Sequence, residues 1–192
     1  MKMSNNSIFD KDYFEIFGLN RQFKQDPVEI RKQYLRLQSN FHPDNFANHS
    51  SYEKQYFLQL STLINDAYQI LMSPLKRAQY LFAHLMQTKV VDSPDENISN
   101  SSHTAFLIEQ MSLREEIESL KSKPNSQILA ELKNKISEMQ LQYEQALTHS
   151  FEQLMSEKSQ EKQQKNIIQQ EIERLIFELQ FYLKLDEELK NI

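Results

Sequence analysis

The sequence of 192 residues contains no cysteine, no tryptophan, one glycine and five prolines. The absence of cysteine excludes disulfide bonds and thiolate metal sites. A single glycine argues against β-sandwiches, β-barrels and phosphate-binding glycine loops, because these structures rely on residues with positive φ. Residues 1–10 lack the apolar run of a signal peptide, and no later segment is apolar enough to span a membrane. We therefore expect a soluble, cytoplasmic, all-α protein with no membrane partner.

Charge is distributed unevenly along the chain. Residues 1–88 carry ten Lys and Arg against eight Asp and Glu, a net charge of +2. Residues 89–192 carry twelve against nineteen, a net charge of −7. Neither half is basic enough to indicate nucleic-acid binding as its main function.

A polar segment separates the two halves. Residues 91–102 contain a proline and four serines, a composition typical of a linker. We predict an N-terminal helical domain over residues 8–88, a linker over 89–103 and a C-terminal helical domain over 104–192.

Local signals place three helices in the N-terminal domain, over about residues 11–17, 27–42 and 51–72. The first should end at Gly18, which can adopt a left-handed cap without strain. The second should begin with Asp26 as N-cap, Pro27 at the first helical position and Glu29 as the acid of a capping box. The third should end at Ser73–Pro74.

The second and third helices each carry one apolar stripe at helical spacing. The stripe of the second helix consists of Ile30, Tyr34, Leu37 and Phe41. The stripe of the third helix consists of Tyr56, Leu60, Leu63, Ala67 and Ile70. Because only a short segment joins these helices, we expect an antiparallel hairpin held together by the two stripes.

The tripeptide His42-Pro43-Asp44 stands at the tip of this hairpin. Proline fixes its own φ and removes an amide donor, so the loop is stiffened before a partner binds. The carboxylate of Asp44 can accept two hydrogen bonds from an arginine. These properties favour a recognition loop, the alternative being an ordinary turn.

Arg31, Lys32 and Arg36 lie on the solvent side of the second helix. This basic face would steer an acidic partner surface toward the loop. The alternative is an ordinary solvated helix face.

Residues 11–82 resemble a J-domain, the module that docks on seventy-kilodalton chaperone ATPases and stimulates their ATP hydrolysis. The resemblance rests on Asp12–Leu19, Phe41–Asp44, Ile64–Tyr68 and Pro74–Leu81. It implies that His42, Pro43 and Asp44 are the trigger for ATP hydrolysis. It further implies that the chaperone docks on Arg31, Lys32 and Arg36.

Three further helices are predicted over about residues 104–121, 126–156 and 161–190. The second of them carries Leu129, Leu132, Ile136, Met139, Tyr143 and Leu147 at coiled-coil-like spacing. The third carries Ile168, Ile172, Leu175, Leu179, Tyr182 and Leu189 in the same manner. An antiparallel three-helix bundle buries all of these stripes.

The first helix of the C-terminal domain carries apolar residues on two faces. At about 100° per residue, its core stripe consists of Phe106, Leu113, Ile117 and Leu120. A second group lies about 100–200° from Phe106 and consists of Leu107, Ile108 and Met111, with Glu115 among them. On the last helix, Phe177 and Phe181 fall opposite the core stripe. Apolar patches outside a core indicate a partner surface; the alternative is that they pack against the N-terminal domain.

The segment Thr104–Ile117 closely resembles the corresponding helix of the HscB family of iron–sulfur cluster co-chaperones. The resemblance implies that an IscU-type cluster scaffold binds a patch consisting of Leu107, Ile108, Met111, Glu115 and Phe177. It also implies that the J-domain brings this scaffold to an HscA-type chaperone. Ser112 and Ser119 stand where the family often has glutamate, which weakens the acidic rim of the patch.

We expect no catalysis, no cofactor and a monomeric chain. We also expect no metal site, because the five histidines show no ligand spacing; they are His42, His49, His84, His103 and His149. One alternative function is a general J-domain co-chaperone for unfolded clients, although the glycine-rich linker and β region usual for that role are missing. Another is a phosphohydrolase using His42 and Asp44, which would need several His and Asp around a metal.

Overall fold

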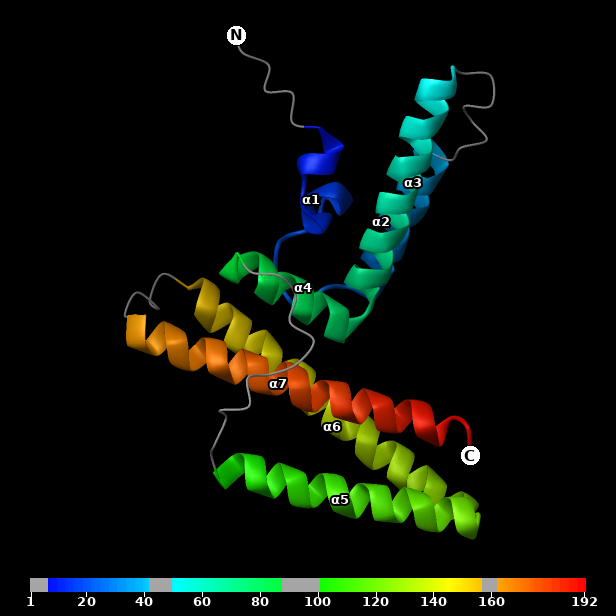
Figure 1. Ribbon diagram of the computed structural model, residues 1–192, viewed down its shortest axis with the longest axis vertical. Coiled ribbons are helices and arrows are strands. Elements are labelled where there is room, and N and C mark those ends of the chain that lie inside the picture. Colours follow the sequence, from blue (N-terminus) through cyan, green and yellow to red (C-terminus); the bar gives the residue numbers. More distant parts are fainter. Residues whose placement is uncertain (1–6, 42–49, 88–100, 157–161) are drawn as a thin grey trace. The chain divides into compact units, whose positions relative to one another are not determined.

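The computed structural model describes residues 7–41, 50–87, 101–156 and 162–192, and every regular element in these ranges is a helix (Figure 1). A 3-10 turn, η1 (Ile8–Asp10), precedes α1 (Tyr13–Phe17), α2 (Pro27–Phe41), α3 (Ser51–Met72), α4 (Pro74–Met86), α5 (Ser101–Ser122), α6 (Ser126–Met155) and α7 (Lys162–Leu189). The predicted all-α fold is confirmed. The chain divides into two compact units, Met1–Val90 and Val91–Ile192, called here the first and second units.

Helix α1 is short because a cap closes each of its ends. The Asp12 side chain accepts a hydrogen bond from the Glu15 amide at 2.9 Å, which satisfies a free donor of the first turn. Gly18 ends the helix with φ +65°, as the sequence predicts. The helix buries Phe14, Ile16 and Phe17 in the core of the first unit.

Helix α2 begins at Pro27, as predicted, but the predicted capping box does not form. The Asp26 carboxylate accepts a hydrogen bond from the Val28 amide at 2.9 Å. The Glu29 carboxylate, predicted to bond back to the N-cap, instead accepts hydrogen bonds from Lys32 and Gln33. The predicted box is therefore wrong in both halves. The Asp26 bond goes to the second helical amide rather than the third, and Lys32 and Gln33, three and four residues along the helix, are available to the Glu29 carboxylate.

Helix α3 starts with a complete capping box between Ser50 and Glu53. It ends at Met72, as predicted, but Ser73 and Pro74 do more than end it. The Ser73 side chain accepts from the Lys76 amide and caps α4, whose first residue is Pro74. The sequence prediction of three helices before the linker therefore missed a fourth, which packs against α3.

Helices α2 and α3 form the predicted hairpin and lie side by side in Figure 1. The α2 stripe is correct: Ile30 and Leu37 are buried, and Tyr34 and Phe41 are half-buried. The α3 stripe is only partly correct, since Tyr56 is exposed and the buried residues are Leu60, Ile64, Ala67 and Leu71. The buried face of α3 is rotated from the predicted one because α4 and α1, as well as α2, pack against it.

A buried arginine ties α4 to the segment that leads into α2. Arg77 donates from Nε to the Phe23 carbonyl oxygen at 2.7 Å and from Nη1 to the Leu71 carbonyl oxygen at 2.5 Å. Its guanidinium also lies 5.2 Å from the centre of the Phe23 ring. These contacts compensate the burial of the charge and fix the start of α2 relative to α4.

The second unit consists, in its described part, of α5, α6 and α7, each antiparallel to the next along the chain (Figure 1). The predicted bounds of these helices agree with the structure to within a few residues. One buried cluster joins the three helices and consists of Phe106, Leu113, Ile117, Leu120, Leu132, Ile136, Phe181, Tyr182, Leu185 and Leu189. The three-helix bundle and the core stripe of α5 are thereby confirmed.

One member of this cluster contradicts the sequence analysis. Phe181, predicted to face away from the core, is buried. Its ring packs edge-on against Phe106 with centroids 5.6 Å apart, and the guanidinium of Arg114 lies 5.9 Å from its centre. The single-stripe prediction failed because the C-terminal half of α7 contributes to the cluster shared with α5 as well as α6, which widens its buried face.

The bundle also buries a carboxylate. Glu178 on α7 is 1% exposed, and Arg174, one turn earlier, donates to its two oxygens at 2.9 and 2.8 Å. Arg174 also pairs with Glu171 at 2.6 Å. Burial raises the pKa of the Glu178 carboxyl, and the opposing effect of Arg174 is smaller.

Candidate partner-binding surfaces

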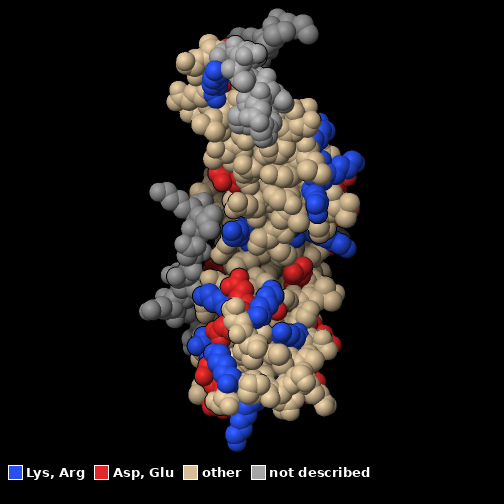
Figure 2. Space-filling view, turned by 90° about the vertical axis from the view of Figure 1, so that its right-hand side faces the viewer, with Lys and Arg blue, Asp and Glu red and all other residues tan. Residues whose placement is uncertain are grey.

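The basic face of α2 is the first candidate surface. Arg31, Lys32 and Arg36 are all exposed, on the side of α2 opposite Ile30 and Leu37. Figure 2 shows Lys and Arg gathered along one edge of the first unit, with few Asp and Glu in view there. The predicted trigger, His42, Pro43 and Asp44, lies outside the described residues.

Hydrogen bonds distinguish the three cations of this face. Lys32 Nζ lies 3.0 Å from the Glu29 carboxylate, and Arg36 Nε donates to Gln33 Oε1 at 2.8 Å. Gln33 in turn donates to Glu29 at 2.6 Å, so that these side chains form one chain of bonds along the helix. The bonds from Gln33 and Lys32 lower the pKa of Glu29. Arg31 makes no hydrogen bond or ion pair with the described residues and is the cation most available to a partner.

Two apolar residues on the same face were missed by the sequence analysis. Val28 is 74% exposed and Leu35 is 57% exposed. They are seven residues apart, which places them two turns apart on one side of the helix. Spacing could have identified them, but the helix was assigned a single apolar stripe.

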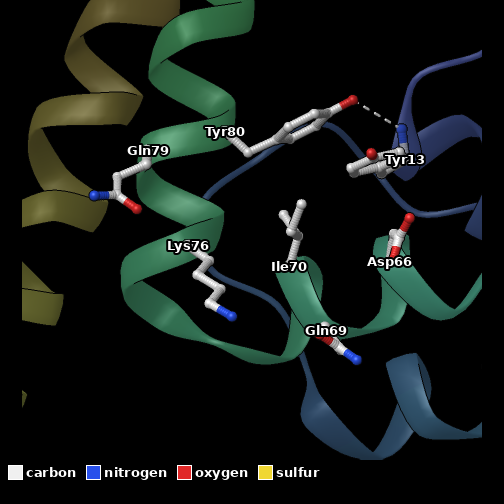
Figure 3. A pocket seen from close by; sticks show the side chains of 7 residues that line it. All are labelled: Tyr13, Asp66, Gln69, Ile70, Lys76, Gln79 and Tyr80. Atoms are coloured by element: carbon white, nitrogen blue, oxygen red, sulfur yellow. Dashed lines mark hydrogen bonds between the residues drawn. The ribbon is translucent and has the colours of Figure 1, made fainter. Parts of the chain in front are cut away.

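A pocket between α1, α3 and α4 was also missed (Figure 3). Its lining residues are Tyr13, Asp66, Gln69, Ile70, Lys76, Gln79 and Tyr80. The two tyrosine rings stack with centroids 4.5 Å apart, and the Tyr80 hydroxyl accepts from the Tyr13 amide at 3.1 Å. Burial raises the pKa of both phenols, so they remain protonated at neutral pH. The pocket therefore offers hydrogen-bonding groups rather than an activated nucleophile.

The second candidate surface is the outward face of α5. Leu107 is 43% exposed, Ile108 is 65% exposed and Met111 is 64% exposed, whereas Phe106 and Leu113 on the opposite face are buried. Helix α5 therefore has one apolar face packed in the bundle and another directed to solvent. We call Leu107, Ile108 and Met111 the α5 patch.

Glu115 and Phe177, the other two predicted members of this surface, differ in their surroundings. Glu115 is exposed and makes no ion pair among the described residues. Phe177 is half-buried and packs edge-on against Phe106, with centroids 6.3 Å apart, at the margin of the core cluster. The structure thus places Phe177 partly inside the bundle.

No group of three or more His, Asp or Glu in the described ranges is placed to hold a metal ion. Among the described helices, none is both long and apolar enough to cross a bilayer.

A basic helical hairpin closed by α1 and α4 is the arrangement of a J-domain. A family model described as the DnaJ domain matches residues 12–80, and this defines the class: the chain is a J-domain protein, a co-chaperone rather than an enzyme. A second family model, described as the HSCB C-terminal oligomerisation domain, matches residues 102–190.

Known proteins resemble both parts together. The chain is 39% identical over 134 residues to the co-chaperone protein HscB homolog of Vibrio cholerae serotype O1, covering 69% of this chain and 75% of that protein. The solved chaperone HscB from Vibrio cholerae superposes with a TM-score of 0.75 at 33% identity, covering 94% of this chain and 96% of that one. The crystal structure of human co-chaperone protein HscB gives a TM-score of 0.76 at 26% identity, covering 94% of this chain and 81% of that one. The chain belongs to the HscB family, the J-domain co-chaperones of iron–sulfur cluster assembly.

Proposed function

We propose that this protein acts in the cytoplasm as a monomer that delivers an IscU-type iron–sulfur scaffold to an HscA-type chaperone and stimulates its ATP hydrolysis. In this proposal, residues 8–88 are the J-domain, 89–103 the linker and 104–192 the scaffold-binding bundle. The protein performs no bond chemistry and, without cysteine, supplies no thiolate to a cluster.

The chaperone-binding role is assigned to the first unit. Arg31, Lys32 and Arg36 are exposed on α2, the helix that leads directly to His42-Pro43-Asp44. A basic face of this kind raises the rate of association with an acidic surface and orients it. We assign docking to the three cations and the trigger to the tripeptide.

The scaffold-binding role is carried by one observation, the second apolar face of α5. Ile108 and Met111 are about two-thirds exposed and contribute little to the packing of the bundle, because the opposite face of α5 supplies the core. Side chains of this size contribute to binding when a partner removes them from water. Glu115 beside them supplies a free carboxylate for a basic residue of the scaffold.

The test is a binding titration of an IscU-type scaffold against the full chain and a variant carrying Leu107→Ala, Ile108→Ala and Met111→Ala. We expect the dissociation constant to rise about tenfold or more, since each truncation removes a contact in the centre of the interface. The matched control is Leu141→Ala on α6, because Leu141 is 57% exposed and should leave the affinity unchanged.

Two outcomes contradict the assignment of this surface. An unchanged affinity together with a lower free energy of unfolding means that the α5 patch packs within the chain. Equal capture of the scaffold and of unrelated unfolded proteins by the full chain means that the protein is a general co-chaperone.

A further inference from the structure

Helix α2 carries an apolar line within its basic face. At about 100° per residue, Val28, Arg31, Lys32 and Leu35 fall within an arc of about 100°, and Arg36 lies just beyond it. Val28 and Leu35 are 74% and 57% exposed, while the inner face of the same helix is packed against α3. A single exposed apolar residue is ordinary. Here two of them lie on the same face of the helix, with cations between and beside them, and together they form a surface that is both apolar and basic.

We propose that Val28 and Leu35 are the apolar centre of the chaperone-docking surface of α2. The surface on the ATPase that fits them is a shallow apolar groove bordered by carboxylates. This inference rests on the proposed function, because it names contacts for the same ATPase partner.

The charges beside this line indicate what borders the groove. Arg31, between Val28 and Leu35, is free of bonds to the described residues, and a partner that covers it would have to offer an acidic group. Lys32 and Arg36 are held by Glu29 and Gln33, but these are exposed bonds of low net strength. Partner carboxylates can therefore replace them at little cost, and docking would place acidic groups on both sides of the apolar line.

The two kinds of contact respond differently to salt. Attraction between exposed charges weakens as ionic strength rises, whereas burial of Val28 and Leu35 does not depend on screening. Loss of the apolar centre should therefore weaken docking at every salt concentration by the same factor. Loss of Arg31 should weaken docking mainly at low salt.

The experiment measures ATP hydrolysis by a purified HscA-type chaperone against increasing concentrations of the full chain, at low and at physiological ionic strength. The variants are Val28→Thr with Leu35→Gln, which keep side-chain size and helical tendency, and separately Arg31→Gln. The matched control is Leu58→Gln, because Leu58 lies on α3 and is 58% exposed.

We expect about ten times more of the double variant to be needed for half-maximal stimulation. Partial burial of two aliphatic side chains against the partner accounts for roughly that factor. The maximal rate should be unchanged, because the trigger is intact, and the salt dependence should match that of the unaltered chain. Arg31→Gln should flatten the salt dependence, and Leu58→Gln should behave like the unaltered chain.

The inference is overturned if the double variant stimulates with the same half-maximal concentration as Leu58→Gln, or if it flattens the salt dependence as Arg31→Gln does. In either case the unaltered chain still stimulates, and the proposed function stands. If the unaltered chain itself gives no stimulation at any concentration, the proposed function fails, and the inference fails with it.

Discussion

The hydroxyl of Tyr34 donates a hydrogen bond to Asn65 Oδ1 at 3.0 Å and so joins α2 to α3. Gln38 Nε2 donates to the same oxygen at 2.7 Å. The Tyr34 ring also stacks on Tyr68 with centroids 4.1 Å apart. One amide oxygen therefore receives both polar bonds from α2, and the stacked rings fix how the two helices lie against each other.

Replacement of this acceptor should destabilise the hairpin. We expect Asn65→Ala to lower the free energy of unfolding by about 1.3 kcal/mol, because two half-buried bonds worth about 1 kcal/mol each are lost and about 0.7 kcal/mol of that is recovered in helical tendency. Asn65→Asp, which keeps an acceptor at this position, should cost less. Urea unfolding followed by circular dichroism measures both, and equal stability of the alanine variant and the unaltered chain would contradict this account.

Truncation of Phe177 should cost stability, whereas truncation of Met111 should not. Phe177→Ala removes a ring packed on Phe106 and should lower the free energy of unfolding by about 2 kcal/mol, less than a fully buried phenylalanine costs. Met111→Ala, at an exposed position of α5, should change it by less than about 0.5 kcal/mol. The same urea titration compares them, and a larger loss for Met111→Ala would show that the α5 patch is packed in the chain.

Glu178 should make stability depend on pH. Burial raises its folded pKa above the ordinary value of 4.5, and Glu171 adds a small increase. Arg174 and a hydrogen bond from Tyr143 lower the pKa, but they do not outweigh burial. The folded state therefore holds this proton more tightly than the unfolded state, and the stabilisation present below 4.5 is lost as pH rises through the folded pKa. Glu178→Gln has no such proton to lose.

The stability of Glu178→Gln relative to the unaltered chain should consequently increase as the pH is raised from about 4 toward neutrality. Urea unfolding of both proteins at several pH values gives this difference directly. A difference that is constant, or that decreases with pH, would show that Arg174 and Tyr143 outweigh burial in setting the Glu178 pKa.

The sequence predicts elements with clear local signals and fails where one signal serves two purposes. Gly18 and Pro27 mark the end of α1 and the start of α2 correctly, since cap and proline geometry are local. Ser73 and Pro74 were interpreted only as the end of α3, although a serine followed by proline is also the start of a helix. Helix α4 was missed for that reason.

Burial by more than one neighbour was the other source of error. A single stripe describes a helix with one neighbour, whereas α7 shares its core with α5 and α6, and this buries Phe181. The buried carboxylate of Glu178 depends on Arg174 and on the packing around both, which periodicity does not show. On the surfaces, the α5 patch was predicted from the helical wheel, whereas Val28 and Leu35 on α2 were not.

We propose that this J-domain activates a chaperone through Asp44. The most direct test is the steady-state rate of ATP hydrolysis by an HscA-type chaperone with Asp44→Asn in place of the unaltered chain. We expect the rate to fall to that of the chaperone alone, while affinity for the scaffold and helix content are retained. Asp66→Asn, the matched control on an exposed α3 carboxylate, should stimulate normally. Stimulation by Asp44→Asn equal to that of the unaltered chain would contradict the claim.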